Sequence, residues 1–301
     1  MHRHGDTSSR LGSDRRVLAW ALGLLVAFMV AEVVVGLLAS SLALLADAGH
    51  MLTDAAALAF ALFAAWLAGR PARGRWTFGF GRAEILAAQA NGLTLALLGI
   101  WIVYEAARRL ADPPEVEAGL VGVLALLGIV VNLAVLALLA RAERKSLNLR
   151  GAHLHIATDL LAFVGTGVAA ALILLTGWDR FDALASLLVA GLMLAAAASL
   201  LVESGRIFLE GAPVSAPPEE VGRAIAEHAG VAETHDLHVW TVTDGFPALS
   251  AHVLVQPGAD CHRIRLELER MLAERFQIDH STLQVEHVGS ARGLEIGRLQ
   301  P

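Results

Sequence analysis

The sequence predicts a polytopic α-helical membrane protein with six transmembrane helices and a cytoplasmic α+β C-terminal domain. Two observations lead to this fold class. Hydrophobic residues make up 56% of the 301-residue chain and charged residues only 17%, whereas soluble domains average about 45–50% and about 25%. The long apolar runs also stop near residue 211, and the residues that follow have the composition of a soluble domain.

Six apolar runs are long enough to cross a bilayer as helices, which takes about 20 residues each. Short connections with turn residues or charges separate them, so we expect spans near 17–38, 42–68, 83–107, 118–140, 153–176 and 182–204. The predicted domains are a disordered cytoplasmic N-terminal tail over 1–16, a membrane domain over 17–211, a soluble domain over 212–288 and a flexible tail over 289–301.

Basic side chains near the span ends fall mostly on one side of this topology. Only Arg108, Arg109 and Arg180 belong to the other side. Because cytoplasmic loops carry an excess of Lys and Arg, both chain ends are predicted to be cytoplasmic. The basic side holds Arg3, Arg10, Arg15, Arg16, Arg70, Arg73, Arg75, Arg82, Arg141, Arg144, Lys145 and Arg150.

The soluble domain has a regular order of patterns. A helix is expected over 217–230, with prolines near its start and Gly230 at its end. Alternating stretches rich in Val and Thr, over 233–245 and 246–258, predict a pair of strands. An amphipathic helix over 260–276 and a last strand over 280–287 complete an α-β-β-α-β order. The simplest packing of these elements is a three-stranded sheet with both helices on one face.

Charge and cysteine content exclude several function classes. Residues 212–301 hold 13 acidic and 7 basic side chains and carry the whole net charge of −6, which argues against a nucleic-acid partner. Cys261 is the only cysteine, so the chain forms no internal disulfide. The single lysine among many arginines is typical of a GC-rich bacterial genome. We therefore expect a bacterial inner membrane protein surrounded by lipid.

Two pairs of ionisable residues lie inside predicted spans. His50 and Asp54 are four residues apart, as are His155 and Asp159, and this spacing places each pair on one helix face. Together the two faces would offer two imidazoles and two carboxylates, which suits tetrahedral Zn²⁺ and also neighbouring divalent ions. A single pair of this kind could instead have a structural role, in which each His forms a hydrogen bond to another helix. Two such pairs on two spans favour a metal site, because charged groups in membranes are costly.

Four motifs, in this order and on these spans, resemble the cation diffusion facilitator family of divalent-metal/proton antiporters. They are SLALLADAGHMLTDA from residue 41, RWTFGFGRAEILAA from 75, GAHLHIATDLL from 151 and HDLHVWTV from 235. The resemblance covers about residues 17–288 and is closest to the zinc-exporting branches. It implies a homodimer that holds its metal between the second and fifth spans, at the quartet His50, Asp54, His155 and Asp159. It also implies a metallochaperone-like, ferredoxin-type soluble domain.

Position along the chain and the resemblance assign roles to further residues. From its position one turn before His50, Asp47 is expected to be a partner of the metal ligands or part of an access path, with a partly hydrated residue near the outer end of the span as the alternative. His153, two residues from His155 and so on another helix face, is expected near the cytoplasmic mouth. Arg82 and Glu210 match a charge interlock between protomers. Several residues of the soluble domain match, by position, the zinc ligands in the C-terminal tails of the family. Each of them could instead be an exposed side chain on a solvated sheet. The tail set is His235, His252 and His262, with Glu286 or His287 from the last strand and Cys261 as an added thiolate.

The function expected from these features is export of Zn²⁺ from the cytoplasm in exchange for H⁺, by alternating access. Metal ligands must be deprotonated to bind, so metal binding releases protons, and histidine titrates in the required range. Two alternatives remain. One is the same transporter with Cd²⁺, Co²⁺, Ni²⁺ or Fe²⁺ as its main substrate, and the other is a membrane metal sensor without net transport. An enzyme is not expected, because a catalytic zinc keeps a position open for water and four ligands would fill it.

Overall fold

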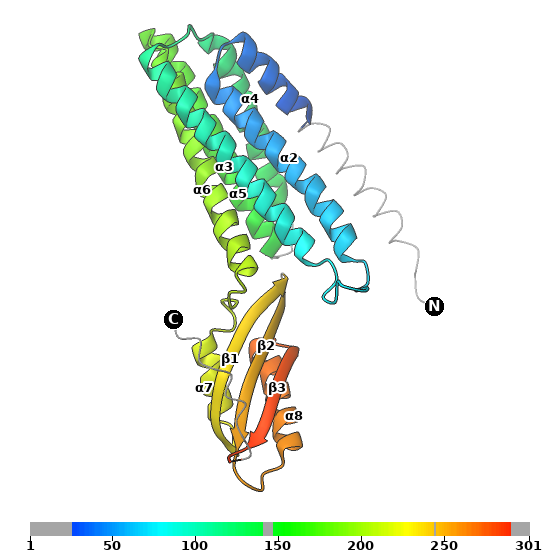
Figure 1. The fold of residues 1–301 in the computed structure, drawn as a ribbon. Helices are drawn as coiled ribbons and strands as arrows, with labels where there is room; N and C mark the ends of the chain where they lie inside the picture. Colours follow the sequence, from blue (N-terminus) through cyan, green and yellow to red (C-terminus); the bar gives the residue numbers. More distant parts are fainter. Residues whose placement is uncertain (1–25, 141–146, 244, 290–301) are drawn as a thin grey trace, which may run out of the picture. The chain divides into compact units, whose positions relative to one another are not determined.

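A computed structural model describes residues 26–140, 147–243 and 245–289 (Figure 1). The predicted N-terminal tail and nearly all of the predicted C-terminal tail lie outside these residues. The chain forms two compact units, of which one holds residues up to 58 together with 91–199. The other holds residues 59–90 together with residue 200 onward.

The described membrane part is a series of apolar helices. A helix over Val26–Leu38 is followed by α2 (Leu42–Ala68), α3 (Arg82–Ala111), α4 (Ala118–Ala140), α5 (Leu147–Thr176) and α6 (Arg180–Phe208). Four helices among the described residues, in α2, α3, α5 and α6, are long and apolar enough to span a bilayer. Val26–Leu38 and the apolar part of α4 are shorter, and the predicted first span begins outside the described residues.

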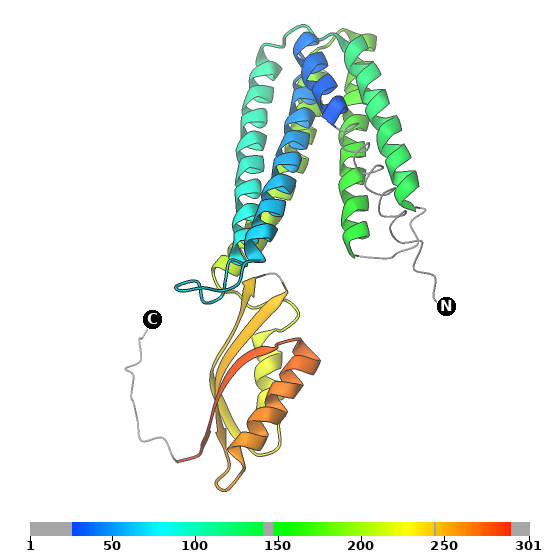
Figure 2. The same cartoon turned by 90° about the vertical axis from the view of Figure 1, so that its right-hand side faces the viewer.

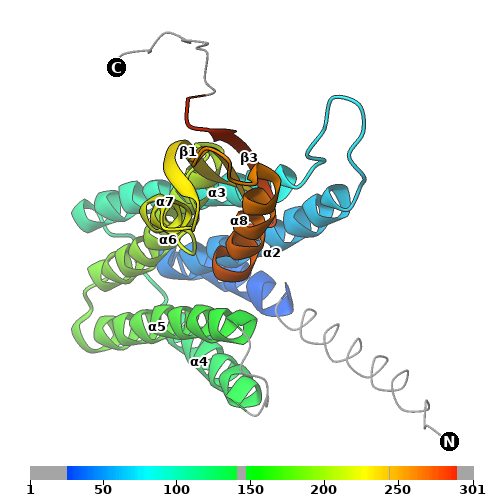
Figure 3. The same cartoon turned by 90° about the horizontal axis from the view of Figure 1, so that it is seen from below.

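Small side chains let the helices of the first unit approach closely. One buried cluster joins α2, α3, α5 and α6 and contains Leu42, Leu95, Ile102, Met193 and several alanines. Membrane helices associate through close packing rather than through a hydrophobic force, so small residues are favoured at their contacts. Figure 3 shows α4 and α5 side by side, and the Cα positions of the two helices confirm that contact.

The N-terminus of α2 is capped from a distant helix. Ser41 precedes α2, and its hydroxyl accepts a hydrogen bond from the Leu44 amide at 3.3 Å. The same hydroxyl donates to the carboxylate of Asp182, at the start of α6. Asp182 also accepts the Leu42 amide at 2.7 Å, and its carboxylate lies 3.9 Å from the Arg109 guanidinium of α3. Free amides at a helix start need such acceptors, so this network fixes three helices to one another.

The soluble domain has the predicted α-β-β-α-β order. Its elements are α7 (Pro218–Ala226), β1 (Val231–Thr243), β2 (Phe246–Val255), α8 (Cys261–Phe276) and β3 (His280–His287). The sheet order is β1-β2-β3, with β1 antiparallel and β3 parallel to β2. Figure 2 shows both helices on one face of the sheet, as predicted. The other face is not covered by either helix, and we call it the open face.

Helix α8 supplies much of the core under the sheet. Ile264, Leu268, Leu272 and Phe276 are buried, and their spacing of three or four residues places them on one side of the helix. Asp260 caps the start of α8 by accepting the Arg263 amide at 3.0 Å. This hydrogen bond from the backbone lowers the pKa of the Asp260 carboxyl.

A bulge in β1 sets which side chains reach the open face. His235 pairs with His252 and His238 pairs with Ser250, with a register shift between them. In a regular strand, residues three apart point to opposite faces. Asp236 adopts a positive φ of 52°, and the resulting bulge puts His235 and His238 on the same, open face.

Candidate metal-binding sites

Three of the four predicted transport ligands meet in the first unit. The Nε2 atom of His50 lies 3.6 Å from Asp54 Oδ2, on the same helix. It also lies 3.8 Å from Asp159 Oδ1 of α5. The i, i+4 spacing on α2 produces the first contact, and the packing of α5 against α2 produces the second.

These distances are close to those of a zinc shell. Two ligand atoms about 2.0–2.1 Å from a tetrahedral ion are about 3.3–3.4 Å apart, so a shift of a few tenths of an ångström would suffice at His50. As they stand, however, no three His, Cys, Asp or Glu side chains within the described part of the chain are grouped closely enough to hold a metal ion. The same contacts would be ion pairs if His50 were protonated.

The fourth predicted ligand, His155, lies on α5. His153 lies on the same helix, and both side chains fall outside the described residues. The two His-x-x-x-Asp pairs were predicted to converge, and the structure shows this for the side chains of His50, Asp54 and Asp159. Convergence stays a prediction for His155, as does the position of His153 near a cytoplasmic mouth.

Two buried carboxyl groups lie beside the three ligands. Asp47 is 4% exposed and Glu32, from the helix Val26–Leu38, is fully buried. The two interact electrostatically, and Asp47 also interacts with His50 and Asp159. The predicted role of Asp47 as a partner of the ligands stays a prediction.

Gly49 allows α3 to pack against α2 next to His50. A Cβ atom at this position would lie 2.9 Å from Leu98 Cδ2 of α3, which is closer than real Cβ atoms come. A larger residue would therefore require the Leu98 side chain to move at the level of the ligands. This glycine has a packing reason that the sequence pattern alone did not reveal.

The second unit brings some of the predicted tail ligands together. The His235 and His252 rings face each other on the open face, with centroids 5.4 Å apart. Asp236, at the bulge, approaches both His252 Nε2 at 3.8 Å and His238 Nε2 at 3.0 Å. Sequence reasoning did not assign Asp236 or His238 to the site, because their position depends on the bulge.

The remaining tail candidates lie apart from this cluster. Cys261 Sγ is 3.6 Å from His287 Nε2, beside the core on the helix-covered face. Glu286 is the neighbour of His287 on β3 and accepts a hydrogen bond from Gln284, so it points to the open face. His262 is exposed at the start of α8. Glu286, rather than His287, therefore shares the open face with His235 and His252.

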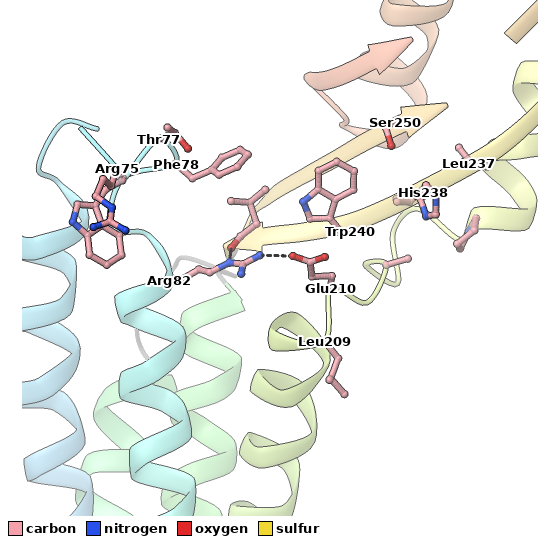
Figure 4. Close-up of a pocket in the computed structure, with 16 residues that line it drawn as sticks. Arg75, Thr77, Phe78, Arg82, Leu209, Glu210, Leu237, His238, Trp240 and Ser250 are labelled. Atoms are coloured by element: carbon pink, nitrogen blue, oxygen red, sulfur yellow. Dashed lines mark hydrogen bonds and ion pairs between the residues drawn. The ribbon is translucent and has the colours of Figure 1, made fainter. Parts of the chain in front are cut away.

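Arg82 and Glu210 form an ion pair inside one chain. The Arg82 Nη2 atom lies 3.3 Å from Glu210 Oε1, as the dashed line in Figure 4 marks. Arg82 Nε also donates to the Val242 carbonyl at 3.2 Å. Both side chains are largely exposed, and exposed pairs contribute about 0–1 kcal/mol. The predicted interlock between protomers stays a prediction.

Two protein-family models match the chain. The model described as the cation efflux transmembrane domain matches residues 18–209. The model described as the cation efflux protein cytoplasmic domain matches residues 216–288. Together they cover the helices of the membrane part and every element of the soluble domain.

Curated relatives match over nearly the full length of the chain. The zinc transporter ZitB of Escherichia coli is 43% identical over 290 residues, which is 95% of this chain and 92% of the relative. The metal cation efflux system protein CzcD of Cupriavidus metallidurans is 41% identical over 94% of this chain and 90% of its own. A cadmium, cobalt and zinc/H⁺-K⁺ antiporter of Bacillus subtilis is 38% identical, over 95% and 91%.

Among solved structures, the metal-bound C-terminal domain of the CzcD transporter is also similar in sequence. It is 38% identical and covers 24% of this chain and 99% of that domain, with a TM-score of 0.23.

Proposed function

The chain belongs to the cation efflux family of multi-pass membrane transporters for divalent metals, and from that premise we propose that it exports Zn²⁺ in exchange for H⁺. The observation that carries the proposal is the meeting of His50 with Asp54 and Asp159, from two membrane helices. Ionisable side chains at membrane depth mark ion pathways, and this set of nitrogen and oxygen ligands suits zinc. His155 would complete the set as the fourth ligand.

Proton exchange follows from the chemistry of these ligands. Asp54 and Asp159 bind metal as carboxylates and His50 binds it as a neutral imidazole, so a bound Zn²⁺ excludes protons from the site. When the metal leaves toward the outside, the same groups take up protons and carry them inward. Each group therefore binds metal on the way out of the cytoplasm and binds a proton on the way back in. Binding of metal and protons at the same time is electrostatically unfavourable.

The proposed metal range follows from the ligand chemistry and from the relatives. The B. subtilis relative is named for cadmium, cobalt and zinc, and imidazole with carboxylate binds all three ions. We place zinc first because two hard carboxylates and two imidazoles favour a tetrahedral shell. A metal sensor without transport is disfavoured, because a sensor does not need ligands at membrane depth.

The topology of the proposal puts both chain ends in the cytoplasm and the protein in a bacterial inner membrane. The basic loops support this orientation, and the family model for residues 216–288 is described as a cytoplasmic domain. We further propose a homodimer in which zinc bound at His235 and His252 regulates transport.

A flux measurement tests the transport proposal. We expect Zn²⁺ uptake into proteoliposomes when an imposed pH gradient drives protons outward, with the internal pH rising as zinc enters and protons leave. A protonophore should abolish the gradient-driven part, and liposomes without protein provide the control. Zinc flux that does not change with the pH gradient would contradict proton exchange. The absence of any flux of Zn²⁺, Cd²⁺ or Co²⁺ would contradict transport.

A second measurement tests the tail site. Replacing His252 with Ala removes one of two facing imidazoles, so zinc binding by the full-length protein should weaken by about 10–100-fold at the tail. Isothermal titration can resolve this loss because the membrane ligands remain intact. His280→Ala, an exposed histidine of β3 outside the facing pair, is the matched control. Equal losses in both variants would count against a specific site at His235 and His252.

A further inference from the structure

The loop between α2 and α3 lies where a bilayer surface must be. Helices spanning Leu42–Ala68 and Arg82–Ala111 are each long and apolar enough to cross the membrane, and only residues 69–81 join them. Both ends of this short connection are therefore expected at the membrane surface. The loop is thus expected at the level of the lipid headgroups.

The loop is strongly basic. Residues 69–81 contain Arg70, Arg73 and Arg75 and no acidic side chain, and Arg82 follows at once. Arg82 is paired with Glu210. Among the described residues, no carboxylate lies within ion-pair distance of the other three arginines. Within the described residues, these three positive charges are therefore available to bind an anion.

Exposed aromatic side chains accompany these arginines. Trp66, Trp76 and Phe78 are 58–61% exposed, which is unusual for such large apolar groups in water. The Arg70 guanidinium lies over the Trp66 ring at 4.1 Å. Trp residues next to basic side chains are typical of membrane interfaces, where the ring lies among the headgroups and the cation meets lipid phosphate.

A cavity of about 860 Å³ opens beside the loop, within the second unit. Arg75, Phe78 and Arg82 line it from the loop and the start of α3, and His238 and Trp240 line it from the open face of β1 (Figure 4). This volume falls within the range of ligand sites, about 300–1,000 Å³. The cavity combines an arginine that lacks a carboxylate partner with aromatic walls, which fits a phosphate carried on an apolar body.

We propose that this cavity, which we call the loop cavity, binds the phosphate of an anionic phospholipid headgroup through Arg75. The planar guanidinium offers paired N–H donors that match phosphate oxygens. Phe78 and Trp240 contact the glycerol and the upper acyl carbons. Bound lipid would link the bilayer directly to strand β1 at Trp240, two residues beyond His238 and five beyond His235 of the tail cluster. This assignment does not depend on which metal is transported.

Native mass spectrometry of the purified full-length protein tests the proposal. The protein is released from a neutral detergent after addition of phosphatidylglycerol, phosphatidylcholine or inorganic phosphate at equal concentration. We expect retained phosphatidylglycerol in preference to phosphatidylcholine, and about tenfold weaker retention for Arg75→Gln. Arg75 is exposed, so the substitution does not disturb a core.

The controls separate this site from general attraction to charge. Arg270→Gln removes an exposed arginine of α8 outside the loop cavity and should retain phosphatidylglycerol like the wild type. Arg73→Gln, in the same loop but outside the cavity lining, should lose less than Arg75→Gln. The proposal is overturned if Arg75→Gln and Arg270→Gln behave alike, or if phosphatidylcholine binds equally. Displacement of the lipid by inorganic phosphate at equal concentration would also overturn it, because the site would then recognise a free anion.

Discussion

Asp159→Asn is expected to abolish zinc transport, with a loss of about 100-fold or more in flux. The substitution keeps the size of the side chain but removes the negative charge that faces His50 Nε2 at 3.8 Å. Groups that merely orient a metal ligand cost about 10–100-fold when lost, and a ligand should cost at least as much. An asparagine also cannot take up the proton that the exchange requires. Flux of radioactive zinc into proteoliposomes under a pH gradient measures the loss.

Asp112→Asn is the matched control for this experiment. Asp112 is an exposed carboxylate just past the end of α3, so its substitution changes the net charge by the same amount and should leave flux unchanged. Zinc binding in detergent should fall for Asp159→Asn and not for the control. Flux retained by Asp159→Asn would mean that Asp159 is not a transport ligand, even if the protein still exchanges zinc for protons.

Much of the fold could be predicted because each element buries a regular pattern. The soluble domain follows its alternating and amphipathic stretches within a few residues, since β1, β2 and α8 each present one apolar side to a shared core. The membrane helices were predicted less exactly at their ends. Helix α5 begins at Leu147, six residues before the predicted span, because hydropathy detects contact with lipid and not the continuation of backbone hydrogen bonds through polar residues.

The sites were predictable only where spacing along one helix decides the geometry. His50 and Asp54 meet because positions four apart share a face. Asp236 and His238 reach the tail cluster through a bulge at a positive φ, which depends on how β1 pairs with β2 rather than on local sequence. Asp182 contacts Ser41 across 141 positions of sequence, and no periodicity relates two residues so far apart.

Asp182→Ala is expected to destabilise the membrane unit by about 3 kcal/mol. Asp182 is 3% exposed and accepts hydrogen bonds from Ser41 and the Leu42 amide. Its loss would leave the Leu42 amide without its acceptor and would remove one of the two carboxylates near Arg109, which keeps its ion pair with Glu105 at 3.4 Å. Breaking one side of a buried charged pair costs about 3–5 kcal/mol. Thermal unfolding of the purified protein, followed by circular dichroism, should show a clearly lower midpoint.

The Asp182 network is distinct from the transport ligands, and this makes the prediction specific. Ser41→Ala removes the hydroxyl but keeps the buried carboxylate, so it should cost only about 1 kcal/mol, as for other helix caps. Asp112→Ala, an exposed carboxylate at the end of α3, should cost about 0.5 kcal/mol or less. At temperatures below unfolding, Asp182→Ala should still bind zinc like the wild type, because none of its partners is a ligand. If Asp182→Ala unfolded at the same temperature as Asp112→Ala, the carboxylate would not anchor α2 to α6, and the packing of small residues alone would hold these helices together.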